Sequence, residues 1–432
     1  MIGINHNDKN KNEYKYKPKE IINPYYMSNP ELYELYKKSL PPIEAYYYFP
    51  KGDEVIIHNY KKPEKALRRI FLGVPYLDIE KKWINEFKSE IASHPETILP
   101  EYWCDAINLR FIYATECNIK KSYERMVKNL QWHKKMFPMY ITPGDKTYKL
   151  LNLGFLYVYG RDHQFRPILI CQPHVIQKNE KDYTADEVIR ASAFLFQYIV
   201  NNMLIPGQIE NWIMILNFEG TSPLSLPDTV KQLIKTLSEN FLARLYKCFV
   251  FGMSFLINFL YKIICNFLEE VTIQKITVLE KKNINKLFEI IRADNIEKKF
   301  GGNAPDAIIG LPNSLFPPRM PSNYFLKEEE DPNKILITEE EYIKLVENNK
   351  IREDCISPHI KEILEKKNKQ LNEMQMKKVI NLKEWKMQNE FEGKKNIDIF
   401  IKSNNNYIYD LKSFNFIKNS FHKSINILGD NN

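Results

Sequence analysis

Side chains that could carry acid–base chemistry are few and lie far apart along the chain. Asp105, Asp162 and Glu219 fall near the ends of predicted elements, and nothing in their spacing pairs two of them as a general acid and a general base. Among the eight histidines, only His163 and His174 lie near one another in sequence. We therefore interpret the carboxylates as caps or surface charges and the histidines as ordinary loop residues.

Sequence motifs for catalysis and cofactor binding are missing as well. The chain contains no G-x-x-x-x-G-K-[ST] loop, no G-x-G-x-x-G after a strand, no H-E-x-x-H and no G-x-S-x-G. The cysteines form no C-x-x-C pair and no cluster with histidine, which is typical of small buried hydrophobic residues in a reducing compartment. They are Cys104, Cys117, Cys171, Cys248, Cys265 and Cys355. The sequence thus predicts a non-enzymatic protein without catalytic residues, metal or cofactor.

Composition further limits the class of protein and the partners that the sequence is compatible with. The 432 residues are 44% hydrophobic, which is enough for a sizeable buried core, and the net charge is +8. A mildly basic chain is compatible with an acidic membrane surface, with nucleic acid, or with no specific partner. The N-terminus has no apolar core of signal-peptide length, and Ile2 stands where myristoylation needs glycine. These features predict a cytoplasmic protein.

The middle of the chain alternates between strand and helix patterns. Residues 155–171 contain two β-prone runs around a polar turn, and Thr184 with Glu187 forms a capping box that opens a helix of about 20 residues. Apolar runs at 211–218, 245–251 and 275–280 have the length of strands, and residues 227–241 show helical periodicity. Alternating strands and helices predict an α/β fold with a mostly parallel sheet.

Changes in composition and periodicity divide the chain into six segments. They are a polar tail that packs locally (1–60), a helical lead-in (61–144), the α/β domain (145–305), a Pro-rich linker (306–335), a charged helical extension (336–395) and an Asn/Lys-rich tail with the composition of a disordered segment (396–432). In the lead-in, Ile119, Tyr123, Met126 and Leu130 fall on one helical face. Thr338 and Glu341 form a second capping box in the extension.

The most apolar stretch, residues 248–270, has the length of a membrane span. Gly252 and Ser254 divide it into a strand of the sheet and a helix of about 14 residues, which is too short to cross. The helix also carries a polar residue at every fourth position, and Lys262 at mid-span would cost about 2.5–3.5 kcal/mol. The pattern therefore favours either a helix packed on the sheet or an amphipathic helix that covers something apolar.

With these elements in order, residues 100–305 resemble the CRAL-TRIO lipid-binding family, which includes phosphatidylinositol/phosphatidylcholine transfer proteins. "LRFIYATECNIKKSYERMVKNLQWHKKMFP" is similar to the helical lead-in of that family, and "GRDHQFRPILI" to its strand–turn–strand. "NWIMILNFEG" resembles the apolar strand that follows, and "IRADNIEKKFGG" the closing element. Each piece alone is weak, but the whole series has the family's order and spacing.

The resemblance implies a sheet that floors a lipid pocket and a helical lid at 254–268. It assigns the apolar face of the lid to Phe255, Leu256, Phe259, Leu260, Ile263, Ile264 and Phe267, and the pocket lining to Trp212, Met214 and Leu216. By the same resemblance, Thr272, Lys275 and Arg244 are candidates for contact with a headgroup phosphate. The sequence departs from the phosphatidylinositol-binding branch at Ala243, where that branch has glutamate, and at Thr115 and Glu116, where it has an Arg-Lys pair.

The function implied is binding of a phospholipid or another hydrophobic small molecule, and its transfer or presentation between membranes, by a protein that associates with membrane surfaces transiently. No nucleic-acid partner is expected. The alternative is a non-enzymatic interaction scaffold, in which the fold is kept for its shape and the charged helix at 357–392 recruits a protein partner.

Overall fold

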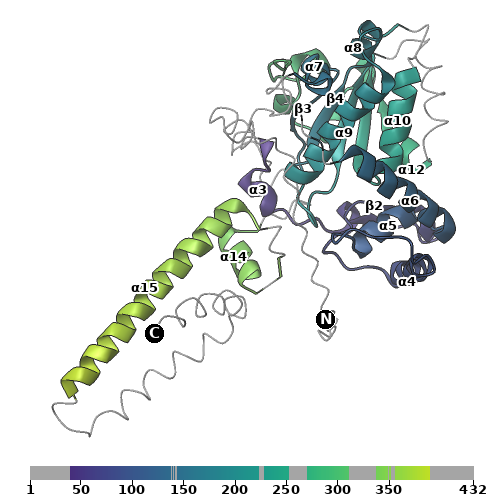
Figure 1. The fold of residues 1–432 in the computed structure, drawn as a ribbon. Helices are drawn as coiled ribbons and strands as arrows, with labels where there is room; N and C mark the ends of the chain where they lie inside the picture. The colour runs from purple at the N-terminus through teal and green to yellow at the C-terminus, as the bar shows by residue number, and fades with distance from the viewer. Residues whose placement is uncertain are drawn as a thin grey trace. The chain divides into compact units, whose positions relative to one another are not determined.

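The chain folds into two compact units, Met1–Leu336 and Ile337–Asn432. The computed structural model describes residues 39–137, 139, 141, 144–222, 228–252, 270–310, 337–348, 350–351 and 356–389. The predicted lid residues, at 254–268, lie outside these ranges, as do Cys265 and Cys355. The first unit holds the sheet and the candidate site (Figure 1).

A five-stranded sheet forms the centre of the first unit, with the strand order β3-β4-β5-β6-β7. The strands are β3 (Leu156–Arg161), β4 (Pro167–Cys171), β5 (Trp212–Asn217), β6 (Leu245–Phe251) and β7 (Ile276–Val278). Only the β3–β4 pair is antiparallel, and the other three pairs are parallel. This arrangement confirms the predicted α/β class with a mostly parallel sheet. The β3–β4 hairpin and the strand at 245–251 also appear where the apolar runs predicted them.

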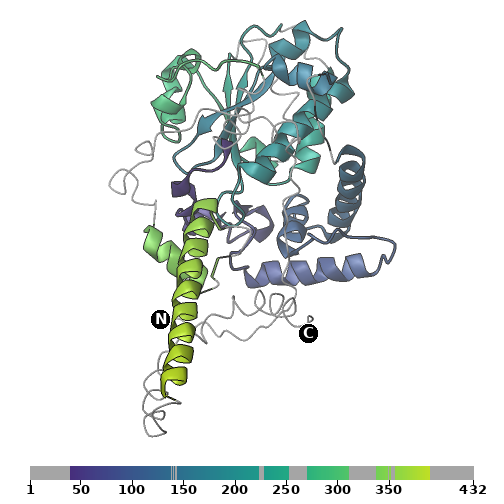
Figure 2. The same ribbon diagram turned by 60° about the vertical axis from the view of Figure 1, so that its left-hand side comes forward.

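Both faces of the sheet are covered, which explains why its strands are nearly continuous apolar runs. Side chains alternate along β5: Trp212, Met214 and Leu216 point to one face, whereas Ile213 and Ile215 point to the other. The first face meets α9 (Ala185–Asn202) and α10 (Asp228–Asn240), as Figure 1 shows. The second meets residues 284–307 with the short helix α13 (Asn285–Phe288), drawn in green beside the sheet in Figure 2.

The helical lead-in packs around a core of its own. Its helices are α4 (Asp78–Ala92), α5 (Asp105–Tyr113) and α6 (Ile119–Met136), and they follow a small hairpin of β1 (Ile56–Ile57) and β2 (Leu67–Arg68). Met126 is fully buried, and Ile119, Tyr123 and Leu130 pack against the same cluster, so the predicted apolar face is confirmed. Asn118 caps the start of helix α6, because its side chain accepts a hydrogen bond from the Lys121 amide.

Shorter elements complete the first unit. They are α3 (Ile43–Tyr46), α7 (Lys146–Asn152), α8 (Pro173–Lys178), α12 (Glu270–Ile273) and five 3-10 turns at Gly52–Glu54, Pro63–Lys65, Lys281–Asn283, Ala293–Asn295 and Lys298–Phe300. Residues 39–50 belong to the body: Ala45 and Tyr48 are buried in the core beside α9, and the Ser39 hydroxyl lies 2.5 Å from the Tyr198 hydroxyl. Hence part of the segment predicted as a polar tail packs on the sheet domain.

The second unit consists, in its described part, of α14 (Glu339–Glu347) and α15 (Pro358–Asn389). The Thr338–Glu341 capping box forms as predicted, with the Glu341 amide 3.2 Å from the Thr338 hydroxyl. Lys367 on α15 forms an ion pair with Glu347 on α14, at 2.5 Å. Farther along α15, Leu371, Met374 and Met376 are exposed.

Candidate functional site

One cavity of about 720 Å³ lies in the first unit, against the sheet face that carries Trp212, Met214 and Leu216. Cys248 and Val250 of β6 and Ile276 of β7 extend this wall. These residues share a face because alternate side chains on parallel strands point the same way, and the register aligns Met214 with Cys248 and Leu216 with Val250. The sheet thus supplies an apolar floor.

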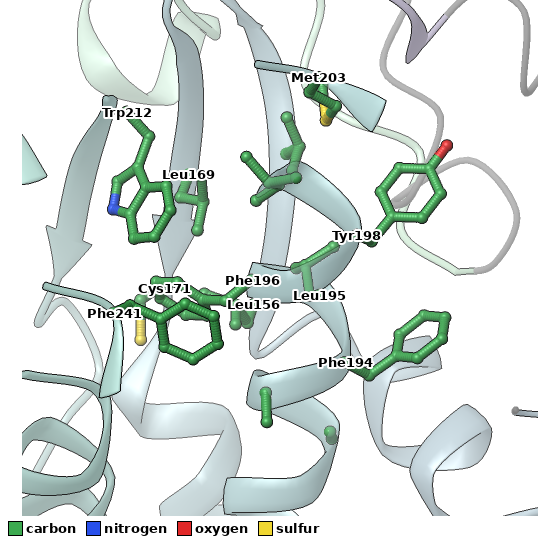
Figure 3. Packing of buried hydrophobic residues seen from close by; sticks show 14 of the residues in the cluster. Leu156, Leu169, Cys171, Phe194, Leu195, Phe196, Tyr198, Met203, Trp212 and Phe241 are labelled. Carbon is green, nitrogen blue, oxygen red and sulfur yellow. The ribbon is translucent and has the colours of Figure 1, made fainter. Parts of the chain in front are cut away.

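One part of the cavity is lined by a group of aromatic rings, hereafter the aromatic cluster: Trp132, Phe196, Trp212 and Phe241. The rings come from α6, α9, β5 and the residue after α10. Ring centroids lie 4.9 Å apart for Phe196 and Trp212, and 5.3 Å apart for Phe196 and Phe241. Trp132 contacts Phe241 edge-on at 5.9 Å. Figure 3 shows Trp212, Phe196 and Phe241 gathered on the sheet side of α9, while Phe194 and Tyr198 point elsewhere.

The charged side chains in the lining, hereafter the polar part of the cavity, are mostly cationic. Seven Lys and Arg side chains and three carboxylates stand among its described lining residues. The cations are Arg68, Lys121, Arg125, Lys128, Lys235, Arg244 and Lys275, and the carboxylates are Glu64, Glu124 and Glu239. Because cations exceed carboxylates, the potential in the cavity favours an anion.

The three predicted phosphate contacts all line this cavity. The Thr272 carbonyl accepts a hydrogen bond from the Lys275 amide at 3.1 Å, so both residues lie on one turn beside β6. The Lys275 ammonium donates to the Leu245 carbonyl at 2.9 Å, and Arg244 donates to the Glu210 carbonyl at 3.0 Å. Trp212, Met214 and Leu216 line the same cavity. The structure therefore brings all six described candidates together, although no ligand defines their roles.

Two buried ion pairs lie in or beside the wall of the cavity. Arg68 binds Glu80 with both side chains fully buried, and the Tyr113 hydroxyl donates to the same carboxylate at 2.6 Å. Arg68 and Tyr113 line the cavity. Burial and the neighbouring Glu80 carboxylate raise the pKa of Tyr113, so its hydroxyl stays protonated and can donate.

The second pair, Arg110 with Glu210, joins the lead-in to the sheet domain. Glu210 also accepts hydrogen bonds from the backbone amides of Phe71 at 3.1 Å, Leu72 at 2.9 Å and Gly207 at 2.9 Å. Burial lowers the pKa of Arg110 to about 9, which leaves the guanidinium charged at neutral pH. Arg110 also donates to the Leu242 carbonyl at 2.9 Å, just before the candidate Arg244.

Sequence reasoning missed the cations of α6. Lys121, Arg125, Lys128 and Trp132 recur at spacings of four, three and four, which places them on one helical face toward the cavity. The periodicity of Ile119, Tyr123, Met126 and Leu130 marks only the opposite, apolar face of the same helix. Arg125 further donates to the Ala114 carbonyl at 2.6 Å and to the Ser238 carbonyl at 3.0 Å, so it links α5 with α10 across the cavity wall.

The carboxylates considered for acid–base chemistry begin a helix, cap a turn or lie at the surface. Asp105 opens α5 and pairs with Lys88 at 2.7 Å, and Glu219 is exposed. Asp162 caps the β3–β4 turn by accepting from the amides of Gln164 and Arg166. Neither His163 nor His174 is among the described lining residues of the cavity. Among the described residues, no cluster of His, Cys, Asp or Glu could hold a metal ion.

The four described cysteines are free thiols. Cys171 and Cys248 are buried, and burial raises the pKa of both thiols to about 12, so both stay protonated. Cys104 and Cys117 are partly buried, and none of the four forms a disulfide.

In the part of the chain with described coordinates, no helix has the length and hydropathy to cross a membrane.

The segment that builds the sheet and most of the cavity wall, residues 151–302, matches a model of the CRAL/TRIO domain family. These residues are a CRAL/TRIO domain. CRAL/TRIO domains bind small lipophilic ligands, which is consistent with an apolar floor and a cavity large enough for a hydrocarbon chain.

Known proteins that resemble the chain share this domain at low identity. A CRAL-TRIO domain-containing protein of Schizosaccharomyces pombe is 22% identical over 228 residues, 49% of this chain and 50% of the relative. Clavesin-1 of Xenopus laevis is 26% identical over 217 residues, 48% of this chain and 63% of the relative. The matches therefore span only about half to two thirds of these relatives. A crystal structure of Sfh5 aligns with 50% of this chain and 85% of its own, at 15% identity and a TM-score of 0.39, a likeness too low to support an inference.

Proposed function

We propose that the protein binds a phospholipid in the CRAL/TRIO cavity and transfers or presents it between membranes. The observation that carries the proposal is a cavity whose described lining combines an apolar floor (Trp212, Met214, Leu216) with the polar side chains of Thr272, Lys275 and Arg244. Such an arrangement suits an amphiphile with an anionic head. Burying each methylene group stabilises the complex by about 0.8 kcal/mol, so an acyl chain of ordinary length supplies most of the affinity.

Phosphate is the headgroup feature that the polar side chains of the cavity fit best. Thr272 offers a hydroxyl, and Lys275 and Arg244 offer charged donors, which form the stronger hydrogen bonds to phosphate oxygens. The glutamate of the phosphatidylinositol-binding branch is replaced by Ala243, which has a φ of 54° and whose carbonyl accepts a hydrogen bond from Asn211 at 2.8 Å. The proposal therefore includes phosphate and leaves the rest of the headgroup unassigned.

Membrane association in this proposal is peripheral and transient, on the cytoplasmic side. A net charge of +8 supports attraction to anionic lipid surfaces, at about 1 kcal/mol for each well-placed Lys or Arg. No covalent chemistry is assigned to the pocket.

The test is extraction of lipid from the full-length purified protein, followed by mass spectrometry, together with an assay of labelled phospholipid transfer between liposomes. We expect co-purified phospholipid and transfer above the spontaneous rate. A protein that is lipid-free after purification, and that takes up no phospholipid from liposomes of any headgroup, would refute the proposal.

A second candidate function, recruitment of a protein partner, is favoured by one observation. Helix α15 lies in a separate unit and exposes Leu371, Met374 and Met376. Cross-linking of the full-length protein in extracts, compared with the variant Leu371→Glu/Met374→Glu, tests this function. Cross-linked products that disappear in the variant would support recruitment, whereas identical products would remove α15 from consideration.

A further inference from the structure

We infer that the hairpin loop at residues 57–62 docks the protein on anionic membranes, with Tyr60 in the bilayer interface and with Lys61 and Lys62 against the headgroups. The inference rests on the proposed function and deepens it, because it names the part of the chain that meets the membrane. It is carried by the exposure of the loop, by its charge and by its continuity with the wall of the cavity.

The loop begins a connection between β1 and β2 that contacts within the chain hold in place. The antiparallel pairing of β1 with β2 closes the hairpin. The Asn59 side chain accepts a hydrogen bond from the Lys62 amide at 3.0 Å, and the rings of His58 and Tyr60 stack with their centroids 5.3 Å apart. The loop is therefore partly ordered before it meets a partner, which lowers the entropy cost of binding.

The side chains of the loop suit the interface of an anionic bilayer. All of residues 57–62 are exposed, and none of them is acidic. Tyr60 is 88% exposed. Tyrosine is enriched at membrane interfaces, because its ring is apolar while its hydroxyl stays in contact with water and headgroups. The adjacent Lys61 and Lys62 add two positive charges, which anionic lipids attract.

A second loop shows that exposure alone does not make such a surface. Ile98, between α4 and α5, is also 88% exposed, and single exposed hydrophobic side chains are common on proteins. Its neighbours Glu96 and Glu101 are exposed, and residues 94–102 contain no lysine or arginine. An anionic surface repels this loop. Of the two loops, only that of Tyr60 combines an exposed ring with positive charge.

The loop continues directly into the wall of the cavity. Residues 64 and 66–68, which follow it in the chain, are among the described lining residues. Lys65 forms an ion pair at 2.7 Å with Glu270, the first residue of α12, and Lys65 followed by Lys62 lowers the pKa of that carboxyl. Helix α12 carries one of the candidate phosphate contacts. A membrane bound at Tyr60 would therefore lie beside this part of the cavity wall.

The first experiment tests whether the loop enters the bilayer. The full-length variant Tyr60→Trp is mixed with liposomes of phosphatidylcholine and phosphatidylserine, and its emission is compared with that of the wild type, which has five tryptophans. We expect a shift to shorter wavelength beyond any wild-type change, because the indole ring enters a less polar region. Ile98→Trp, at the equally exposed position, should show no such additional shift.

The second experiment measures affinity for the same liposomes by cosedimentation. Lys61→Ala/Lys62→Ala should weaken binding about twentyfold, since each lysine near an anionic surface contributes roughly a factor of five. Lys81→Ala/Lys82→Ala removes two exposed lysines of α4 and is the matched control, which should change the affinity less than about twofold. On liposomes of phosphatidylcholine alone, the difference between the two double variants should disappear.

The outcomes separate the inference from the proposed function, which is tested by uptake of phospholipid into the wild-type protein. An unshifted Tyr60→Trp emission, or equal weakening by the two double variants, overturns the inference while phospholipid uptake keeps the proposed function in place. A wild-type protein that takes up phospholipid but does not sediment with anionic liposomes also overturns the inference. A wild-type protein that takes up no phospholipid refutes the proposed function and the inference with it.

Discussion

Replacing Glu210 with glutamine should destabilise the first unit strongly, because this carboxylate ties the lead-in to the sheet domain. It accepts from three backbone amides and pairs with Arg110, and both side chains are nearly inaccessible to solvent. Glutamine keeps the shape but removes the charge, and it turns one acceptor into a donor that faces other donors. Removing one partner of a buried ion pair costs about 3–5 kcal/mol. Arg110 retains the Leu242 carbonyl, so we expect about 3 kcal/mol.

Urea unfolding followed by tryptophan fluorescence measures this change, with limited proteolysis to show whether the lead-in detaches first. Glu86→Gln on the exposed side of α4 is the matched control, and it should lie within about 0.5 kcal/mol of the wild type. A variant Arg110→Met in the Glu210→Gln background should recover part of the loss, since the uncompensated charge is gone. A Glu210→Gln protein less than about 1 kcal/mol below the wild type would refute the reasoning.

Two further predictions concern the site and its surroundings. Lys275→Ala should weaken binding of a phosphate-bearing lipid about tenfold in a liposome competition assay, whereas Lys247→Ala, a partly buried lysine that is absent from the described cavity lining, should not. An equal loss for a lipid of the same chain without phosphate would contradict the assigned contact. Burial lowers the pKa of His133 to about 4, below its unfolded value of 6.5, so the unfolded state binds the extra proton. The free energy of unfolding should therefore fall as pH drops from about 6.5 toward about 4, by about 2 kcal/mol at pH 5. The variant His133→Phe should show a weaker pH dependence of this free energy in urea titrations. An unchanged pH dependence in the variant would mean that another group causes it.

The sheet was predictable because its signals are local. Each strand is a short apolar run between turn residues, and the capping boxes at Thr184 and Thr338 bring together side chains only three residues apart. The candidate lining residues of β5 were predictable for the same reason, since alternation along one strand decides which side chains share a face.

The contacts between distant segments around the cavity were not predictable from such local signals. Arg110 and Glu210 are 100 residues apart, and the sequence around either residue gives no sign that the other is its partner. The same holds for the contact of Phe241 with Trp132, which depends on how α6 meets the end of α10. The packing of residues 39–50 on the sheet domain was not predictable either, because a short Tyr- and Pro-rich segment has no periodicity that indicates a helix or a strand.

The position of Glu210 also sets an order for events during synthesis of the chain. The backbone amides of Phe71 and Leu72 precede it by 139 and 138 residues, and Arg110 precedes it by 100. At about 5–20 residues per second, the lead-in waits roughly 5–30 s on the ribosome before its partner carboxylate exists. Until Glu210 is synthesised, Arg110 has no carboxylate partner, and we expect the lead-in to stay open while β3 and β4 emerge. We expect the wall that carries Arg68 and Tyr113 to close against the sheet domain only once Glu210 is available.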